Sequence, residues 1–291
     1  MSVAILTDTN SGFTVEDAEE KGIYVIPTPF YIDDKLYYEG VDLDHDKFFE
    51  LQAADHEIHT SMPLVGDVMD KWHELLDEYD EIVYIPLSSG LSSSCETAIM
   101  LAEDDDFDGR VFVVNNQRIS ATMKLSAMEA KALADEGKSA AEIKEYLEEH
   151  KSESAIYIMV DTLKYLKRGG RITPAAAAVG SLLHIKPVLQ IQGEKLDKFA
   201  MARTTKQGKQ IMLDAIKKDA EERFEDPDGS GLVMSIAHTD NQEEAEKLRE
   251  ELLSLYPNHQ VVIDPLSMVV ACHIGPGSLA VTVSKSFLKE M

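Results

Sequence analysis

Residues 82–94 read Ile82-Val83-Tyr84-Ile85-Pro86-Leu87-Ser88-Ser89-Gly90-Leu91-Ser92-Ser93-Ser94, and this stretch decides the fold class. Its apolar run, through Leu87, predicts a buried strand, and a helix-compatible segment follows from about Ser93 to Glu103. A small polar loop between a strand and a helix is how α/β proteins hold anions, because unpaired N–H groups and partial positive charge gather at the helix N-terminus. The alternative interpretation is an ordinary turn whose serines cap the helix.

The composition narrows the class of protein. The 291 residues are 44% hydrophobic, which is enough for a real core in one large domain or two moderate ones. The formal net charge of −25 argues against binding to nucleic acid or to anionic lipid surfaces. No apolar run reaches the roughly 18–20 residues of a membrane span, and the start of the chain lacks the features of a secretory signal. Only Cys95 and Cys272 occur, so we expect reduced thiols in a cytoplasmic protein without stable membrane anchoring.

Strand-like and helix-like segments alternate through the first half of the chain, which predicts a mostly parallel sheet flanked by helices. The pattern changes near Ser152, so we expect two α/β domains, over residues 1–152 and 153–291, the second with a mixed sheet and helices. Residues 28–40 resemble a hairpin or an extended segment, with a turn at Asp33-Asp34. Other expected elements are a helix at 140–150 begun by a Ser139/Glu142 capping box, an Ala-rich helix at 175–183, an antiparallel pair at 187–191 and 195–202, and a helix at 205–224.

The familiar motifs of nucleotide, metal and hydrolase chemistry are absent from the sequence. Its nine histidines are scattered without metal-ligand spacing, so we expect no metal site and no cofactor. Four polar loops beside apolar runs remain, at Thr60-Ser61, Ser88–Ser94, Lys167–Arg171 and His273–Gly277. Hydroxyls, a histidine and a helix N-terminus suit one carboxylate or phosphate. Each loop also has a plain structural interpretation, such as a capped turn, a surface ion pair or a core histidine.

Six segments carry a resemblance to a known family. In chain order they are Leu6–Ser11, Thr60–Leu64, Ser88–Ser94, Gly169–Ile172, Gly180–Pro187 and His273–Gly277. Together they resemble the DegV family, bacterial proteins that bind long-chain fatty acids, with its patterns T-D-S-T, T-S-x-P-S, S-S-G-L-S-G-T, G-G-R-I, G-S/N-L-L-x-I-K-P and H-x-G-P-G. The resemblance runs in order over about residues 3–285, so it implies that the two expected domains form one DegV-like protein.

By that resemblance, Thr60 and Ser92 would bind the carboxylate of a fatty acid such as palmitate, with Ser61, Ser89 and His273 beside them. The acyl chain would lie in a tunnel between the two domains. The protein would then be a monomeric carrier in lipid transport and fatty acid metabolism, with no catalytic residues of its own.

The resemblance also implies a partner. Some family members present the acid to a separate fatty acid kinase, which phosphorylates the carboxylate. Arg171 and Arg203 match positions in basic segments that would face such a kinase.

This sequence departs from the family pattern in the loops around the acid. Leu64 replaces the usual serine, and Ser93 replaces the usual glycine. Asn115-Asn116 follows the strand at 111–114 where the family usually has Asp-Ser.

Two other functions are compatible with the same residues. The chain could be an acyl hydrolase or transferase with Ser92 as the nucleophile and His273 as the base. It could also bind a small polar metabolite on the same α/β scaffold. The ligand that accompanies the protein from cells separates these alternatives from the carrier.

Overall fold

Four parallel strands form the sheet of the first half of the chain, in the order β2-β1-β6-β7. They are β1 (Val3–Asp8), β2 (Tyr24–Ile26), β6 (Glu81–Ile85) and β7 (Val111–Val113). The computed structural model describes residues 2–54, 56–172, 185–193, 195–289 and 291. It divides into two units, Met1–Ser152 and Glu153–Met291, called here the first and second unit. The parallel sheet that the alternating pattern predicted is confirmed.

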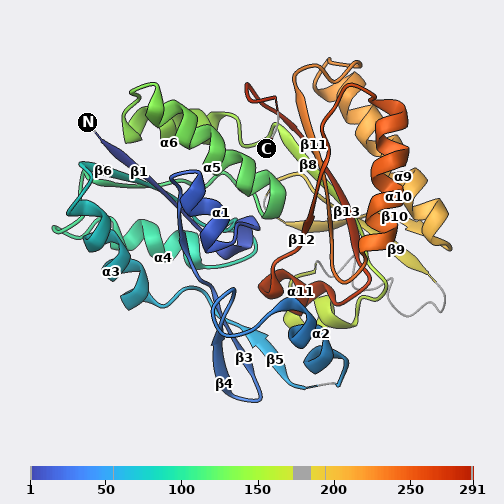
Figure 1. Ribbon diagram of the computed structural model, residues 1–291, viewed down its shortest axis with the longest axis horizontal. Coiled ribbons are helices and arrows are strands. Elements are labelled where there is room, and N and C mark those ends of the chain that lie inside the picture. The colour runs from blue at the N-terminus through green and yellow to red at the C-terminus, as the bar shows by residue number, and fades with distance from the viewer. Residues whose placement is uncertain (1, 55, 173–184, 194, 290) are drawn as a thin grey trace. The chain divides into compact units, whose positions relative to one another are not determined.

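Helices cover both faces of this sheet (Figure 1). On one face Ile5 and Val83 pack against α1, α5 and α6, and on the other Leu6 and Tyr84 pack against α3 and α4. The helices are α1 (Val15–Glu20), α3 (Val65–Leu76), α4 (Ser94–Leu101), α5 (Ser120–Asp135) and α6 (Ala140–Glu149). Because neighbouring residues of one strand are buried on opposite faces, the strand sequences are continuously apolar rather than alternating. The capping box of Ser139 and Glu142 is present at the start of α6.

A small antiparallel sheet also belongs to the first unit, in the order β4-β3-β5. Its strands are β3 (Pro29–Ile32), β4 (Lys35–Tyr38) and β5 (Ile58–Thr60), and α2 (His45–Ala53) lies between the last two in sequence. The predicted hairpin turn is confirmed at Asp33 and Asp34, whose φ angles of 48° and 65° fit the two-residue turn that matches strand twist. The strand β5 was not expected from the sequence, and it ends at Thr60.

The second unit is built on a six-stranded mixed sheet, in the order β10-β9-β8-β13-β11-β12. Its strands are β8 (Ser154–Met159), β9 (Lys186–Ile191), β10 (Leu196–Ala202), β11 (Leu232–His238), β12 (Val262–Pro265) and β13 (Leu279–Lys285). Only the pairing of β11 with β12 is parallel among the pairings described. The mixed sheet and the antiparallel β9–β10 pair are as predicted.

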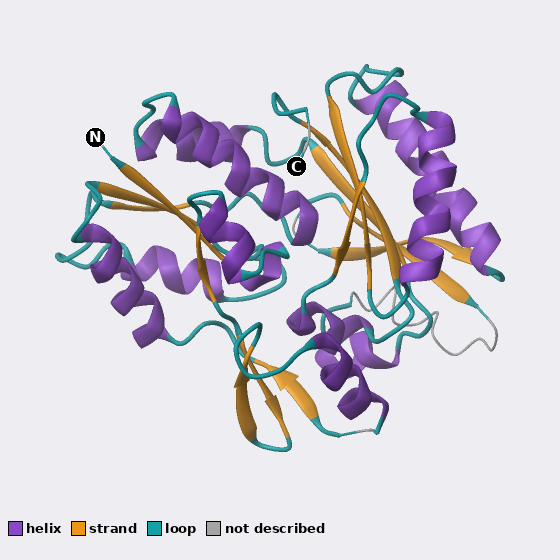
Figure 2. Cartoon of the chain, viewed as in Figure 1, coloured by secondary structure: helices purple, strands orange, loops and turns teal. Residues whose placement is uncertain are grey.

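Two long helices, α9 (Thr205–Lys218) and α10 (Gln242–Leu255), pack on one face of the mixed sheet. Figure 2 shows them beside the strands of this unit. The sequence predicted one helix as far as Phe224, but α9 ends at Lys218 and a π-helical turn, Asp219–Arg223, follows. In that turn the Asp219 carboxylate accepts a hydrogen bond from the Tyr157 hydroxyl at 2.8 Å, so a buried polar contact accompanies the change of helix type. The predicted Ala-rich helix at 175–183 lies outside the described residues.

The carboxylate of Asp8 joins the ends of β1 and β6 in the first unit. The side chain is fully buried, and its Oδ2 accepts a hydrogen bond from the Leu87 backbone N–H at 3.1 Å. Its Oδ1 accepts from the backbone N–H and the side-chain amide of Asn10, at 2.9 and 2.7 Å. Burial raises the pKa of Asp8 to about 6, although these hydrogen bonds act in the opposite direction. The start of the serine-rich loop is therefore fixed from the end of β1.

The substitution Asp8→Asn should remove a pH dependence of stability. The folded-state pKa of about 6 lies above the ordinary value of 3.8, so the carboxyl group favours folding below pH 3.8 and loses that contribution as the pH rises through 6. The loss is about 3 kcal/mol at roughly 1.36 kcal/mol per pKa unit. Denaturant unfolding of both proteins at several pH values checks this. The free energy of unfolding of the variant should increase relative to that of the parent protein as the pH rises. A difference that does not depend on pH would contradict the raised pKa of Asp8.

Candidate functional site

The serine-rich loop, Ser88–Ser94, connects β6 to α4 in the first unit. Its first backbone N–H, that of Ser88, donates to the carbonyl of Arg118 at 3.1 Å. The Ser88 carbonyl then accepts from the backbone N–H groups of Leu91 and Ser92 at 3.0 and 3.1 Å, which closes a tight turn. The loop therefore lies at the carboxyl edge of the parallel strands, where open α/β sheets bind ligands.

Two hydroxyls of this loop accept hydrogen bonds from the protein. The Oγ of Ser92 accepts from the Ser94 backbone N–H at 3.2 Å, and the Oγ of Ser89 accepts from the Asn115 side-chain amide at 2.9 Å. A serine hydroxyl has one proton to donate, and neither of these bonds uses it. Both serines are partly exposed. The arrangement can therefore present two O–H donors, together with the N-terminus of α4, to an anion.

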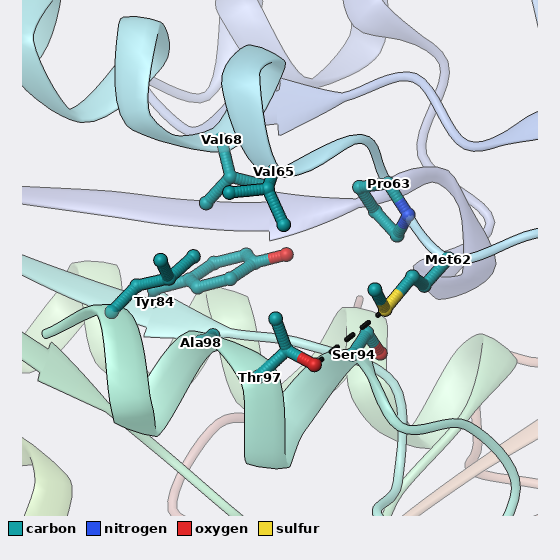
Figure 3. Close-up of a pocket in the computed structure, with 9 residues that line it drawn as sticks. Met62, Pro63, Val65, Val68, Tyr84, Ser94, Thr97 and Ala98 are labelled. Atoms are coloured by element: carbon teal, nitrogen blue, oxygen red, sulfur yellow. Dashed lines mark hydrogen bonds between the residues drawn. The ribbon is translucent and has the colours of Figure 1, made fainter.

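The Thr60–Pro63 segment lies against the start of α4 (Figure 3). Thr60 ends β5, where it pairs with Phe30, and Ser61 donates its backbone N–H to the Pro29 carbonyl at 3.3 Å. The sulfur of Met62 accepts from the hydroxyls of Ser93 and Thr97 of the α4 region, both at 3.6 Å. Two polar segments that are distant in sequence are thus brought together through a methionine.

Figure 3 also shows an apolar pocket beside this contact, between α3 and α4. Its lining consists of Met62, Pro63, Val65, Val68, Tyr84, Ser94, Thr97, Ala98 and Leu101. The empty space, open mouth included, is about 230 Å³. The cavity proper, without that mouth, has about 10 Å³, which is room for little more than a water molecule, so this pocket by itself is too small for a long acyl chain.

The departures from the family pattern have local consequences in the first unit. Leu64 precedes α3 as its N-cap and makes no side-chain capping bond, so the serine that is usual there would add one. Ser93 is exposed and gives its hydroxyl to the Met62 sulfur, a contact that a glycine could not make.

In the second unit, His273 lies on a helix rather than in a loop. The sequence predicted a polar loop at His273–Gly277, but α11 runs over Met268–Ile274, with its N-terminus capped by Ser267. The basic segment also needs correction, because Lys167 and Arg168 belong to the last turn of α7 (Lys164–Gly169). That helix ends at Gly170, whose φ of 66° is left-handed, so the loop proper begins there.

The helices α7 and α11 approach closely because two glycines lack side chains. A Cβ built on Gly169 would lie 2.2 Å from the Nδ1 of His273. A Cβ on Gly275, where φ is 76°, would lie 2.3 Å from the Cδ2 of Tyr165. The Gly275 carbonyl is also held, because it accepts from the Thr239 hydroxyl at 2.6 Å. The Gly-Gly-Arg and His-x-Gly-Pro-Gly motifs therefore form one packed cluster within the second unit.

The imidazole of His273 is held in its neutral form. Burial, and secondly the nearby Arg171 guanidinium, lower its pKa from 6.5 to about 4. At neutral pH the ring can thus donate or accept a hydrogen bond but adds no positive charge.

The two candidate docking arginines are exposed on the second unit. Arg171 donates through Nη1 to the Gly169 carbonyl at 2.5 Å, and the backbone N–H of Arg203 donates to the Gln207 side chain at 2.8 Å.

The predicted site residues fall in both units. The first unit holds Thr60, Ser61, Ser89 and Ser92 on two segments that meet, and the second holds His273 in contact with the Gly169 region. Sequence reasoning gave no role to Met62, nor to the amide of Asn115 on Ser89. The signal for Asn115 was its place directly after a strand, at the same sheet edge as the serine-rich loop.

Two further properties concern the described part of the chain. None of its helices is long and apolar enough to cross a membrane. No group of three or more His, Cys, Asp or Glu side chains among the described residues is placed to hold a metal ion.

Comparison with known proteins gives consistent matches along the chain. Residues 2–286 match the family model described as an uncharacterised protein of the DegV family. Protein DegV of Bacillus subtilis (strain 168) is 31% identical over 285 residues, which cover 97% of this chain and 98% of that protein.

Two solved structures share the fold. One is described as fatty acid binding of a DegV family protein from Thermus thermophilus, with a TM-score of 0.89, 27% identity, and coverage of 98% of this chain and 100% of that one. The other is DegV, described as a fatty acid binding protein, from Bacillus subtilis. Its TM-score is 0.86 and its identity 29%, again with 98% and 100% coverage.

The substitution Gly169→Ala should destabilise the second unit, because the new methyl group would overlap the His273 ring. We expect a loss of about 1–3 kcal/mol in the free energy of unfolding, as for overpacking elsewhere. The matched control is Gly66→Ala in α3, where a Cβ meets nothing within 4 Å and helix propensity should add about 0.5–1 kcal/mol. Urea denaturation of the three proteins measures both effects. Equal changes in the free energy of unfolding for the two substitutions would show that the close approach of Gly169 to His273 does not affect stability.

Proposed function

This chain belongs to the DegV family, and on that premise we propose that it binds a long-chain fatty acid as a carrier. The carboxylate would be bound by Thr60, Ser61, Ser89 and Ser92 of the first unit with His273 of the second, and the acyl chain would lie between the units. The protein would do so as a monomer in the cytoplasm, with no chemistry of its own. Two relatives of the same fold, described as fatty-acid-binding proteins, support the class of ligand.

The observation that carries the proposal is the state of the two loop hydroxyls. Ser89 and Ser92 each accept a hydrogen bond from the protein, so their protons remain to be donated. An ionised carboxylate only accepts hydrogen bonds, and hydrogen bonds to a charged group are worth about 1.5–3 kcal/mol. Donors of this kind offset the several kcal/mol that burying an unpaired carboxylate would cost.

The tail supplies the affinity in this scheme. About 15 methylene groups at ~0.8 kcal/mol each offer about 12 kcal/mol of transfer free energy. The loss of translational and conformational freedom on binding removes an appreciable part of that. The polar loops then select for the acid head group rather than contribute most of the binding energy.

The substitution Ser92→Ala should weaken fatty-acid binding by about 10- to 100-fold, since it removes one donor to a charged group. The control is Ser254→Ala on α10, an exposed serine whose hydroxyl donates to the Glu250 carbonyl at 2.8 Å, and we expect it to leave the affinity unchanged. Isothermal titration with palmitate measures both variants, and thermal unfolding confirms that α4 is intact. Equal effects of the two substitutions would remove Ser92 from the site.

The same variant tests the alternative of an acyl hydrolase. Purified protein incubated with acyl esters should release no acid in a Ser92-dependent manner. Hydrolysis by the parent protein that disappears in Ser92→Ala would show that the protein is an enzyme and would contradict the carrier proposal.

Native mass spectrometry of protein purified from cells tests the third alternative, the binding of a small polar metabolite. A bound polar metabolite in place of a long-chain acid would contradict the proposal.

We further propose that the loaded protein presents its acid to a fatty acid kinase through Arg171 and Arg203. Because Arg171 also acts on the pKa of His273, Arg203→Glu is the cleaner substitution. It should leave palmitate affinity unchanged and reduce phosphorylation of the bound acid by a cognate kinase at least roughly 10-fold, since it reverses a surface charge at the docking face. Rates measured as a function of carrier concentration check this. Unchanged kinase turnover would remove Arg203 from the docking surface.

A further inference from the structure

The hydroxyls proposed to bind the carboxylate come from two different sheets of the first unit. Thr60 ends β5, an edge strand of the small antiparallel sheet, and Ser61 follows it. Ser92 lies in the loop after β6, a strand of the parallel sheet. No strand pairing joins these two sheets among the described residues. The spacing between the two sets of hydroxyls is therefore set by contacts outside the sheets.

The side chain of Met62 makes such a contact (Figure 3). Its sulfur accepts hydrogen bonds from the hydroxyls of Ser93 and Thr97, both at 3.6 Å. The Thr97 backbone N–H donates to the Ser93 carbonyl at 2.9 Å, so these two residues lie one turn apart on the same face at the start of α4. The half-buried Met62 also lines the apolar pocket with Pro63 and Val65. A thioether suits both roles, because it is apolar and its sulfur is a weak acceptor.

Two departures from the family pattern lie beside this contact. Ser93, in place of the usual glycine, supplies one of the two donors to the sulfur. Leu64, in place of the usual serine, leaves the N-terminus of α3 without a side-chain capping bond. A capping serine at position 64 would tie the end of the Thr60–Pro63 segment to α3. In this chain the segment is tied instead from Met62 to α4.

We propose that Met62 is a positioning residue of the fatty-acid site, whose sulfur holds Thr60 and Ser61 at the spacing from Ser92 that suits one carboxylate. This inference rests on the proposed function and adds the residue that sets the geometry between the two hydroxyl segments. Groups that are held in place before the ligand arrives lower the ordering cost of binding. Without the contact, the Thr60–Pro63 segment must be ordered when the ligand binds, so the affinity falls.

The substitution Met62→Leu tests this, because leucine fills the same space but gives the two hydroxyls no acceptor. Palmitate affinity, measured by isothermal titration, should fall about 3- to 10-fold, which corresponds to ordering roughly one further side chain on binding. Exchanges of methionine for leucine are well tolerated, so urea unfolding should differ little from that of the parent protein. The matched control is Met100→Leu on the same helix as Thr97, where the methionine is 70% exposed, and it should leave the affinity unchanged.

A double-mutant cycle with Thr97→Val separates positioning from a purely structural role. Thr97→Val should weaken palmitate binding in the parent protein and change it little in the Met62→Leu protein, where the contact is already lost. Equal effects of Thr97→Val in both backgrounds would overturn the positioning role, because the hydroxyl would then act independently of the sulfur. Unchanged affinity in Met62→Leu would overturn it as well, even if the free energy of unfolding fell. A parent protein that fails to bind palmitate at all would instead overturn the proposed function.

Discussion

The first unit depends on a carboxylate placed where water cannot reach it. Asp8 holds the end of β6 through the Leu87 N–H, and the serine-rich loop begins one residue later. Desolvation of this group is unfavourable, as the raised pKa records, and three N–H donors offset only part of that cost. The buried carboxylate therefore lowers the stability of the protein near neutral pH, and in return it fixes the position of the serine-rich loop. Such a trade-off between stability and function is expected at a binding site.

Much of the fold could be predicted because periodicity and turn chemistry are local properties. The strands of the parallel sheet, the Asp33-Asp34 turn and the Ser139/Glu142 cap all follow from residues close in sequence. The short strand β5 could not be predicted, since Ile58–Thr60 becomes a strand only by pairing with β3. The π-helical turn after Lys218 was missed for a similar reason, as its Asp219 contacts Tyr157 of a distant strand.

The types of residue in the candidate site could be predicted from the sequence, but their positions and contacts could not. Hydroxyls after a strand indicated an anion site, and Ser89 and Ser92 do lie at the carboxyl edge of the sheet. The bond from the Ser94 N–H to Ser92 is local, but the contact of the Asn115 amide with Ser89 joins residues 26 apart in sequence, and no local pattern encodes it. His273 was expected in a loop because Gly275 follows so soon, yet the apolar residues before it form one buried helix.

The close approach of Gly169 and His273 carries a consequence for how sequences of this kind can diverge. A larger residue at 169 leaves no room for the imidazole of His273. If the glycine is substituted first, the His273 ring must therefore be displaced. Replacing the histidine first removes the polar group while the glycine still weakens its helix. Neither single substitution leaves the contact intact, so the two residues constrain each other although they lie far apart in the gene.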